Sequence, residues 1–409
     1  MTIIESVAAE AVVRELFFTP EGRADPYPRY HRLRELAPVF RSDQLQAWLL
    51  TRYDDCKSAL RDPRLEKHFA ESLDARAPGW RARPGLEWSS RTMLNLDAPE
   101  HTRLRRLVVR EFTPRTVETL RPQVEAMVDD LLGAMHDVGE LMEELAFKLP
   151  IAVIGMLLGV PPEDRPQFRE LTQRLTGVFE LGATRDMLDE ADAAVLECIA
   201  YFDALIEERR ARPQDDLLSR LIVQDAGAAP ESGEPDRLTN AELNNLSALL
   251  FLAGFETTTN LIGNGMISLL TQPDQMDALR SQPELSANVA DELLRHDGTV
   301  QLAGRFATAD VAFGDVTIRP ATGSSCSSAP RTATRPGIPI PTGSTSPERR
   351  CSHWRSAAAC ISASAHRSRG SRSKSCFASW RSASRPSSCK ASYHRTGTGS
   401  RCAPPRRCR

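Results

Sequence analysis

The chain has 409 residues and a net charge of −2, so its length allows two average domains or one large domain. This near-neutral balance conceals an asymmetry, because residues 319–409 hold a single carboxylate, that of Glu348, among many arginines. No apolar run reaches membrane-spanning length, and the N-terminus lacks the basic segment of a signal peptide. Composition therefore argues against a membrane or secreted protein, and we expect a cytoplasmic one.

Cysteines cluster in the same C-terminal part, which holds seven of the nine. Such a cluster suggests a disulfide or zinc module, but it contains no C-x-x-C pair, so a zinc site is not expected. The rest of the chain has only two cysteines, Cys56 and Cys198, and such sparse use is typical of proteins in a reducing cytoplasm.

The predicted elements are mainly helical up to residue 318, with a strand indicated early by "AWLLTRY". A helix is predicted around residues 118–135, because apolar residues recur there at intervals of three and four. These residues are Val117, Leu120, Val124, Met127, Val128, Leu131 and Met135. The turn-rich residues 224–237 predict a surface loop, and "DVAFGDVTI" predicts further strands at residues 310–318.

Between these last two segments, Thr239 and Glu242 form a T-x-x-E capping box before a proline-free run that ends at Pro273. The run predicts a helix roughly 45 Å long, at about 1.5 Å per residue. Its middle is apolar almost all round, which is typical of a buried central helix. After Ile318 the periodicity stops, and the Ser, Arg, Pro, Thr and Gly residues that follow predict a disordered tail.

Residues 253–260, "AGFETTTN", lie in the middle of this helix and are locally unfavourable for it. Threonine is a poor helix former whose hydroxyl competes for backbone carbonyls, so the helix can loosen there and leave a bulge with room for water. Gly254 has no Cβ and lets a flat group approach the helix closely. The ordinary interpretation of this pattern is a kinked core helix with a solvated Glu256.

The string A-G-F-E-T-T resembles the oxygen-activating segment in the central helix of cytochromes P-450, the haem-thiolate monooxygenases. In that family the acid and the following alcohol relay protons to bound dioxygen, and the resemblance gives this role to Glu256 and Thr257. It also implies that Ala253 and Gly254 lie against the haem, with Gly254 clearing space for the haem and dioxygen.

Further segments resemble the family in the same order over residues 15–318. "DAPEHTRLRR" is similar to its H-x-x-x-R segment, which implies that His101 and Arg105 bind the haem propionates, and Arg305 matches a third propionate ligand. "DELLR" is similar to its E-x-x-R segment, which implies a buried ion pair between Glu292 and Arg295. Taken singly, each match has an ordinary alternative as a surface charge or an i, i+3 helix pair.

The family's cysteine loop, F-G-x-G-x-H-x-C-x-G, is absent from the written sequence. The thiolate of that cysteine is the fifth ligand of the iron and donates electron density that favours O–O cleavage. No metal ligand can therefore be assigned. Cys351 or Cys360 is a poor substitute, because "AAACISAS" lacks the Phe and Gly residues that cradle the haem.

The missing loop reappears when the third base of each codon is read with the first two bases of the next codon. From His353 onward this displaced frame permits L-A-F-G-G-G-x-H-x-C-L-G, followed by A-P-L-A-R-L-E. From Ser328 to Thr345 it permits G-A-A-N-R-D-P-A-R-Y-P-D-P-D-R-F-D, which resembles the family segment before the loop. We therefore predict a net loss of one base near Ile318, with residues 1–318 forming a cytochrome P-450 domain and residues 319–409 an out-of-frame basic tail.

The resemblance implies a mainly α fold with small β-sheets and a long central helix over haem b. The in-frame protein is expected to insert one atom of O2 into a small organic substrate, with electrons from a ferredoxin or flavodoxin partner. The apolar residues Val300, Leu302 and Ala303 are candidates for the wall of the substrate pocket. The chain as written is expected to bind little or no haem and to be inactive, because it lacks the thiolate.

Two other classes of function stay open from the residues. The basic tail could bind nucleic acid or an anionic surface, and such binding would weaken steeply with salt. The tail resembles no binding motif, however, so no nucleic-acid partner and no membrane are expected. The body could also serve as a haem-free helical module that binds a partner.

Overall fold

The computed structural model describes residues 3–136, 139–180, 183–223, 237–320 and 326–330. The α-helices are α1 (Ile3–Phe18), α2 (Pro20–Ala24), α3 (Tyr27–Leu36), α4 (Tyr53–Ala59), α5 (Phe69–Arg76), α6 (Pro84–Ser90), α7 (Glu100–Val109), α8 (Pro114–Ala134), α9 (Lys148–Leu158), α10 (Gln167–Leu175), α11 (Arg185–Ala211), α12 (Leu217–Val223), α13 (Asn240–Leu270), α14 (Pro273–Ser281) and α15 (Ser286–His296). Short helical turns are η1 (Trp80–Ala82), η2 (Met142–Ala146), η3 (Thr176–Phe179) and η4 (Pro283–Leu285). The strands are β1 (Val39–Ser42), β2 (Ala47–Leu50), β3 (Leu65–Glu66), β4 (Leu302–Ala307), β5 (Val311–Phe313), β6 (Val316–Ile318) and β7 (Cys326–Pro330). The fold is thus mainly helical with small sheets, as the sequence predicts.

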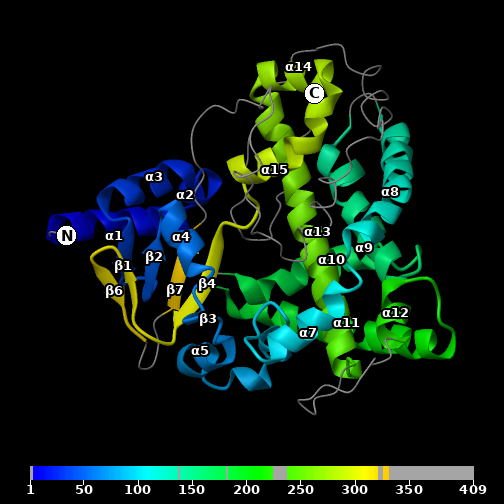
Figure 1. Cartoon of the computed structure of the whole chain (residues 1–409), viewed down its shortest axis with the longest axis horizontal. Coiled ribbons are helices and arrows are strands. Elements are labelled where there is room, and N and C mark those ends of the chain that lie inside the picture. The colour runs from blue at the N-terminus through cyan, green and yellow to red at the C-terminus, as the bar shows by residue number, and fades with distance from the viewer. Residues whose placement is uncertain (1–2, 137–138, 181–182, 224–236, 321–325, 331–409) are drawn as a thin grey trace.

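A five-stranded sheet in the order β1-β2-β7-β4-β3 lies on one side of the molecule beside α1 to α4 (Figure 1). Strand β7 pairs in parallel with β2 and antiparallel with β4, so the backbone of residues 326–330 lies inside the sheet. Strands β5 and β6 form a separate antiparallel hairpin. Gly314 turns this hairpin with φ +59°, a left-handed conformation that favours glycine.

Helix α13 runs through the helical part of the molecule (Figure 1). The Thr239 hydroxyl accepts the backbone N–H of Glu242, and the Glu242 carboxylate accepts the backbone N–H of Thr239. The predicted capping box is therefore present. Its first half packs against α9, α10 and α11, and Phe251 stacks on Phe168 with ring centroids 4.1 Å apart. This half of the helix is the centre of the largest hydrophobic core, which confirms the prediction of a buried central helix.

Several local predictions hold. The strand predicted from "AWLLTRY" is β2, and residues 310–318 form the hairpin β5–β6. The helix predicted around residues 118–135 is α8, although none of its residues is buried. The loop predicted for residues 224–237 lies almost entirely outside the described residues, as do the cysteines and the tail predicted beyond residue 330.

Helix α13 is also long and apolar enough to span a membrane by composition alone. However, 61% of its most apolar window is buried inside the protein. The apolar character of α13 is therefore that of a core helix, but the expectation that no apolar run reaches membrane-spanning length is wrong for this segment.

Candidate functional site

Glu256 and Thr257 occupy the middle of α13, where the helix leaves the densest part of the core. Burial raises the pKa of the Glu256 carboxyl from its ordinary value to about 7, so this acid can gain or lose a proton near neutral pH. The Thr257 hydroxyl donates to the carbonyl oxygen of Ala253 over 2.6 Å. This is the back-bond to the preceding turn that the sequence predicts, yet the helix stays α-helical throughout and shows no bulge.

Ala253 and Gly254, which precede Glu256 and Thr257 on α13, differ from each other in their surroundings. Gly254 is buried, and a Cβ added to it would lie 3.5 Å from the side chain of Ile154 on α9. A methyl group at Gly254 would therefore fit in ordinary contact with α9, and the predicted role of Gly254 in clearing space for haem and dioxygen stays a prediction. Ala253 is only partly buried, so it is the small residue of this pair with an open side.

Three cationic residues predicted to bind propionates come from separate elements, α7 and β4. The pKa of the His101 imidazole is lowered, mainly by burial. The positive charges of Arg105 and Arg305 lie close enough to His101 to lower its pKa further. Like charges gathered in this way favour an anionic ligand, because such a ligand relieves their mutual repulsion. The structure thus brings together all three predicted propionate ligands.

Asp97 belongs to this neighbourhood and was missed by the sequence reasoning. Its carboxylate accepts backbone N–H groups of Lys67 and His68 over 2.7 Å each, and its carbonyl oxygen accepts the N–H of His101 over 2.8 Å. The negative charge of Asp97 also opposes the lowering of the His101 pKa. An acid placed just before "APEH" at a helix start was the signal that could have indicated it.

Glu292 and Arg295 form the predicted ion pair on α15, with two bonds of 2.8 and 2.6 Å between the guanidinium and the carboxylate. The pair is not buried, because 35% of the Arg295 side chain and 20% of the Glu292 side chain are exposed. The described residues therefore confirm the contact and correct the predicted burial. Helix α15 itself contains no buried residue.

The residues predicted as a substrate wall lie before and within β4. Val300 is 41% exposed, while Leu302 and Ala303 are partly buried and pair through their backbones with residues of β7. Arg305 follows on the same strand, so these residues approach the cation cluster from the sheet side. Nothing in their contacts identifies a substrate, and their role stays a prediction.

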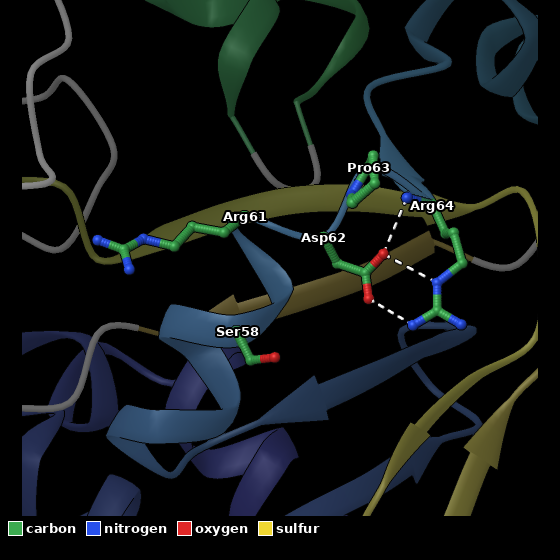
Figure 2. Close-up of a pocket in the computed structure, with 5 residues that line it drawn as sticks. All are labelled: Ser58, Arg61, Asp62, Pro63 and Arg64. Atoms are coloured by element: carbon green, nitrogen blue, oxygen red, sulfur yellow. Dashed lines mark hydrogen bonds and ion pairs between the residues drawn. The ribbon is translucent and has the colours of Figure 1, made fainter.

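An open hollow of about 410 Å3 lies elsewhere, on the turn between α4 and β3 (Figure 2). It is lined by Ser58, Arg61, Asp62, Pro63 and Arg64. Figure 2 shows that Asp62 and Arg64 bond to each other across it, with Nη2 to Oδ2 at 2.7 Å. A single short segment forms this hollow and none of the residues discussed above lines it, so it is not the candidate site.

Comparison with known proteins identifies the family. The family model described as "Cytochrome P450" matches residues 48–323, which is more than half of the chain. This chain is a member of the cytochrome P450 family. Cytochrome P450 107B1 of Saccharopolyspora erythraea is 43% identical over 313 residues, 74% of each chain. The monooxygenase PikC of Streptomyces venezuelae is 42% identical over 287 residues, 68% of this chain and 64% of PikC.

Solved cytochrome P450 structures agree with this assignment. The bacillaene polyketide synthase cytochrome P450 PksS of Bacillus subtilis superposes with a TM-score of 0.71 at 31% identity, over 85% of this chain and 88% of PksS. Members of this family are haem-dependent monooxygenases that use O2 and external electrons to oxidise organic substrates. The family resemblance inferred from the sequence is therefore confirmed.

The described residues fit the periphery of a haem but not its iron. The guanidinium groups of Arg105 and Arg305, with the His101 imidazole as a neighbouring hydrogen-bond donor, suit two propionates. Burial raises the pKa of both Cys56 and Cys198 to about 12, so neither is a ready thiolate. Among the described residues no group of three His, Cys, Asp or Glu side chains could hold a metal ion.

Proposed function

We propose that the in-frame protein oxidises a small organic substrate with O2, and that α13 supplies the protons for this reaction. The observation that carries the proposal is the pKa of about 7 that burial gives to Glu256, next to the hydroxyl of Thr257. A bound haem b, held at its propionates by the cation cluster, would supply the redox chemistry of oxygen activation.

The residues of α13 contribute proton handling in this proposal. Glu256 is partly exposed on the helix and can take a proton from solvent near neutral pH. The Thr257 hydroxyl is held in place by the Ala253 carbonyl and can accept a hydrogen bond from a neighbouring donor while it donates its own. In this proposal each residue handles protons from its own position on α13, Glu256 by exchange with solvent and Thr257 by its hydroxyl.

We further propose that the chain as written does not carry out this reaction, because a lost base near Ile318 removes the thiolate loop. Two findings support the displaced frame. The family match ends at residue 323, close to the predicted boundary at residue 318. The alignment with Cytochrome P450 107B1 likewise leaves about a quarter of each chain unmatched.

The finer features of the function follow from the relatives and the sequence. We propose a polyketide-like substrate, because the structurally similar PksS is described as part of a polyketide synthase system. We propose a ferredoxin or flavodoxin as electron donor, since residues 1–318 resemble no flavin or dinucleotide domain. The cysteine usage of the body supports a cytoplasmic location.

Restoring one base between the codons for Ile318 and Arg319 tests the proposal. The restored protein should bind haem and give the ferrous carbonyl spectrum of a thiolate-ligated haem, whereas the written chain should not. In the restored protein, Glu256→Gln should keep this spectrum and slow substrate turnover by about 10²-fold or more, because the proton donor is lost. A written chain with the thiolate spectrum, or a restored chain without it, would contradict the displaced frame.

A further inference from the structure

Thr259 is the third threonine of the run in α13, and the proposed function gives it no role. The residue is 2% exposed, so its hydroxyl lies in the core and needs a hydrogen-bond partner there. Thr257, two residues earlier, donates to the Ala253 carbonyl of its own helix. The Thr259 hydroxyl instead leaves α13 and donates to the backbone carbonyl oxygen of Ala146 over 2.9 Å. One hydroxyl therefore joins α13 to the segment just before α9.

The Ala146 carbonyl has a chemical reason to need this donor. In an α-helix the carbonyl of residue 146 would accept the N–H of residue 150. That residue is Pro150, which has no N–H. Ala146 is 0% exposed, so bulk solvent does not reach its carbonyl, and a buried carbonyl without a donor is costly. The Thr259 hydroxyl thus replaces the helical bond that Pro150 cannot make.

The winding of the chain also changes at this point. Element η2 is a π-helical turn, and the N–H of Phe147 donates to the carbonyl of Met142, five residues back, over 2.8 Å. The α-helix α9 begins at Lys148, so the change from one winding to the other falls beside the carbonyl that Thr259 binds. Turns of this π type are rare and are frequent at functional sites.

Contacts one turn before and one turn after Thr259 follow the same line. Phe255 packs on Phe147 with ring centroids 6.0 Å apart. A Cβ on Gly263 would lie 2.8 Å from the Met142 sulfur, so a side chain there would displace that sulfur. Helix α13 thus meets η2 and the start of α9 at every fourth residue and runs in the opposite direction. We call these three contacts the seam, and Thr259 supplies its directional, polar contact.

Glu256 lies beside the seam. It follows Phe255 directly and precedes Thr259 by three residues, so Glu256 and Thr259 share one side of the helix. Burial raises the pKa of the Glu256 carboxyl to about 7. Because burial depends on how closely α13 is held to its neighbours, a contact that fixes the seam also controls the surroundings of this acid.

The charged residues on neighbouring elements have partners of their own. Glu143 of η2 bonds to Arg169 over 2.7 Å, and Glu144 accepts a backbone N–H of its own segment over 2.7 Å. On α15, which also contacts α13, Glu292 and Arg295 pair with each other. The hold of the seam, which keeps water from Glu256, is therefore the feature that a single substitution can change.

We propose that Thr259 is a positioning residue, which fixes the Glu256 segment of α13 on the seam by donating to the carbonyl that Pro150 leaves open. For the role of Glu256 this rests on the proposed function, but the hydrogen bond itself requires neither haem nor the restored frame. Without the hydroxyl, the Ala146 carbonyl would stay buried and unpaired. The seam would loosen there, and water would reach Glu256.

A double-mutant cycle in the full written chain tests the bond. Thr259→Val keeps the size of the side chain and removes the hydroxyl, so it should lower the folding equilibrium constant, measured in urea, by about tenfold or more. In Pro150→Ala the new N–H at position 150 can donate to the Ala146 carbonyl, so Thr259→Val should then cost about threefold or less. Thr258→Val, the matched control on the same turn, should also cost about threefold or less.

Infrared titration of the same chain tests the positioning of Glu256. The band of the protonated carboxyl is assigned by its loss in Glu256→Gln, and the pH at its midpoint is measured. Thr259→Val should move this midpoint down by about half a pH unit or more, because water favours the charged form of the acid. Thr259→Ser keeps the hydroxyl and should restore the midpoint, and Thr258→Val should leave it unchanged.

Two outcomes would overturn the proposal. If Thr259→Val costs the same with and without Pro150, the hydroxyl does not replace the helical bond. If the cycle is coupled but the Glu256 midpoint stays in place, Thr259 joins two helices without positioning the acid. Should Thr259→Val unfold the chain, recovery of the fold in the Pro150→Ala background supports the bond and its absence contradicts it. The proposed function fails separately, since an unsubstituted chain in which Glu256 titrates at its ordinary pKa refutes its proton handling and leaves the coupling in the cycle untouched.

Discussion

Burial gives Glu256 a pKa of about 7, and this shift links the stability of the fold to pH. Below about 4.5 the carboxyl is protonated in both the folded and the unfolded state, so it has no effect. As pH rises toward 7 the unfolded chain releases the proton more readily, and the folded state loses stability. Glu256→Gln should remove this loss and raise the free energy of unfolding at pH 8 by at most about 3 kcal/mol, at 1.36 kcal/mol per pKa unit and less for partial exposure.

Urea unfolding of the unsubstituted chain and of the Glu256→Gln variant between pH 4 and pH 8 measures this effect. The two curves of stability against pH should meet near pH 4 and separate as pH rises. Parallel curves would show that Glu256 titrates at its ordinary pKa in the folded protein, which would also remove the basis for its proposed proton transfer.

The surroundings of Gly254 give a second test at the residue scale. A methyl group at this position fits in ordinary contact with Ile154, so Gly254→Ala should stabilise α13 by about 1 kcal/mol through better helix propensity. The matched change Gly22→Ala should destabilise the protein, because its methyl would lie 1.9 Å from the backbone oxygen of Glu15. A lower haem content of restored Gly254→Ala protein would instead support the predicted contact with haem.

At the scale of elements, the C-terminal end of α11 is joined to the start of α12 by an ion pair that no local pattern indicated. Arg209 on α11 donates to Asp216 over 2.7 Å and to the carbonyl oxygen of Gly159 over 2.5 Å, and both charged side chains are at most 4% exposed. Asp216→Ala should cost about 3–5 kcal/mol, because it leaves a buried guanidinium without its carboxylate. The control Glu208→Gln removes a half-exposed partner of the same arginine and should cost at most about 1 kcal/mol.

Thermal unfolding of the two variants separates these effects. A similar loss of stability in Asp216→Ala and Glu208→Gln would mean that solvent, and not Asp216, balances the Arg209 charge.

The elements also show which features the sequence could predict. The capping box of Thr239 and Glu242 and the periodicity of α8 are local, so both helices could be located from the sequence. The partners of each helix are not local. The apolar stripe of α8 indicates that something should cover it, but only the structure shows that no described element does so fully. The cluster of His101, Arg105 and Arg305 could be predicted because two separate segments matched one family, whereas Asp97 acts through backbone contacts for which its place before a helix start was the sole local signal.

At the scale of the whole molecule, the described chain is a helical core joined to a sheet that is completed by β7. The backbone of β7 pairs with β2 on one side and β4 on the other, so it holds the two parts of the sheet together even though it follows the predicted base loss. Backbone hydrogen bonds require no particular side chains, so a segment that is predicted to be out of frame can still occupy a central strand. The main core, by contrast, depends on side chains, and among the described residues those that form it all precede α14.

Deletion of residues 331–409 should therefore leave both the midpoint and the slope of urea unfolding unchanged. The slope follows the surface exposed on unfolding, and a segment without Leu, Val or Met buries little of it. Deletion of residues 326–409 is the matched control, since it also removes β7 and should lower the midpoint by opening the sheet between β2 and β4. A smaller slope after the shorter deletion would show that the tail packs on the body. An unchanged slope, together with a larger one in the base-restored protein, would show that the C-terminal quarter contributes packed surface only in the displaced frame.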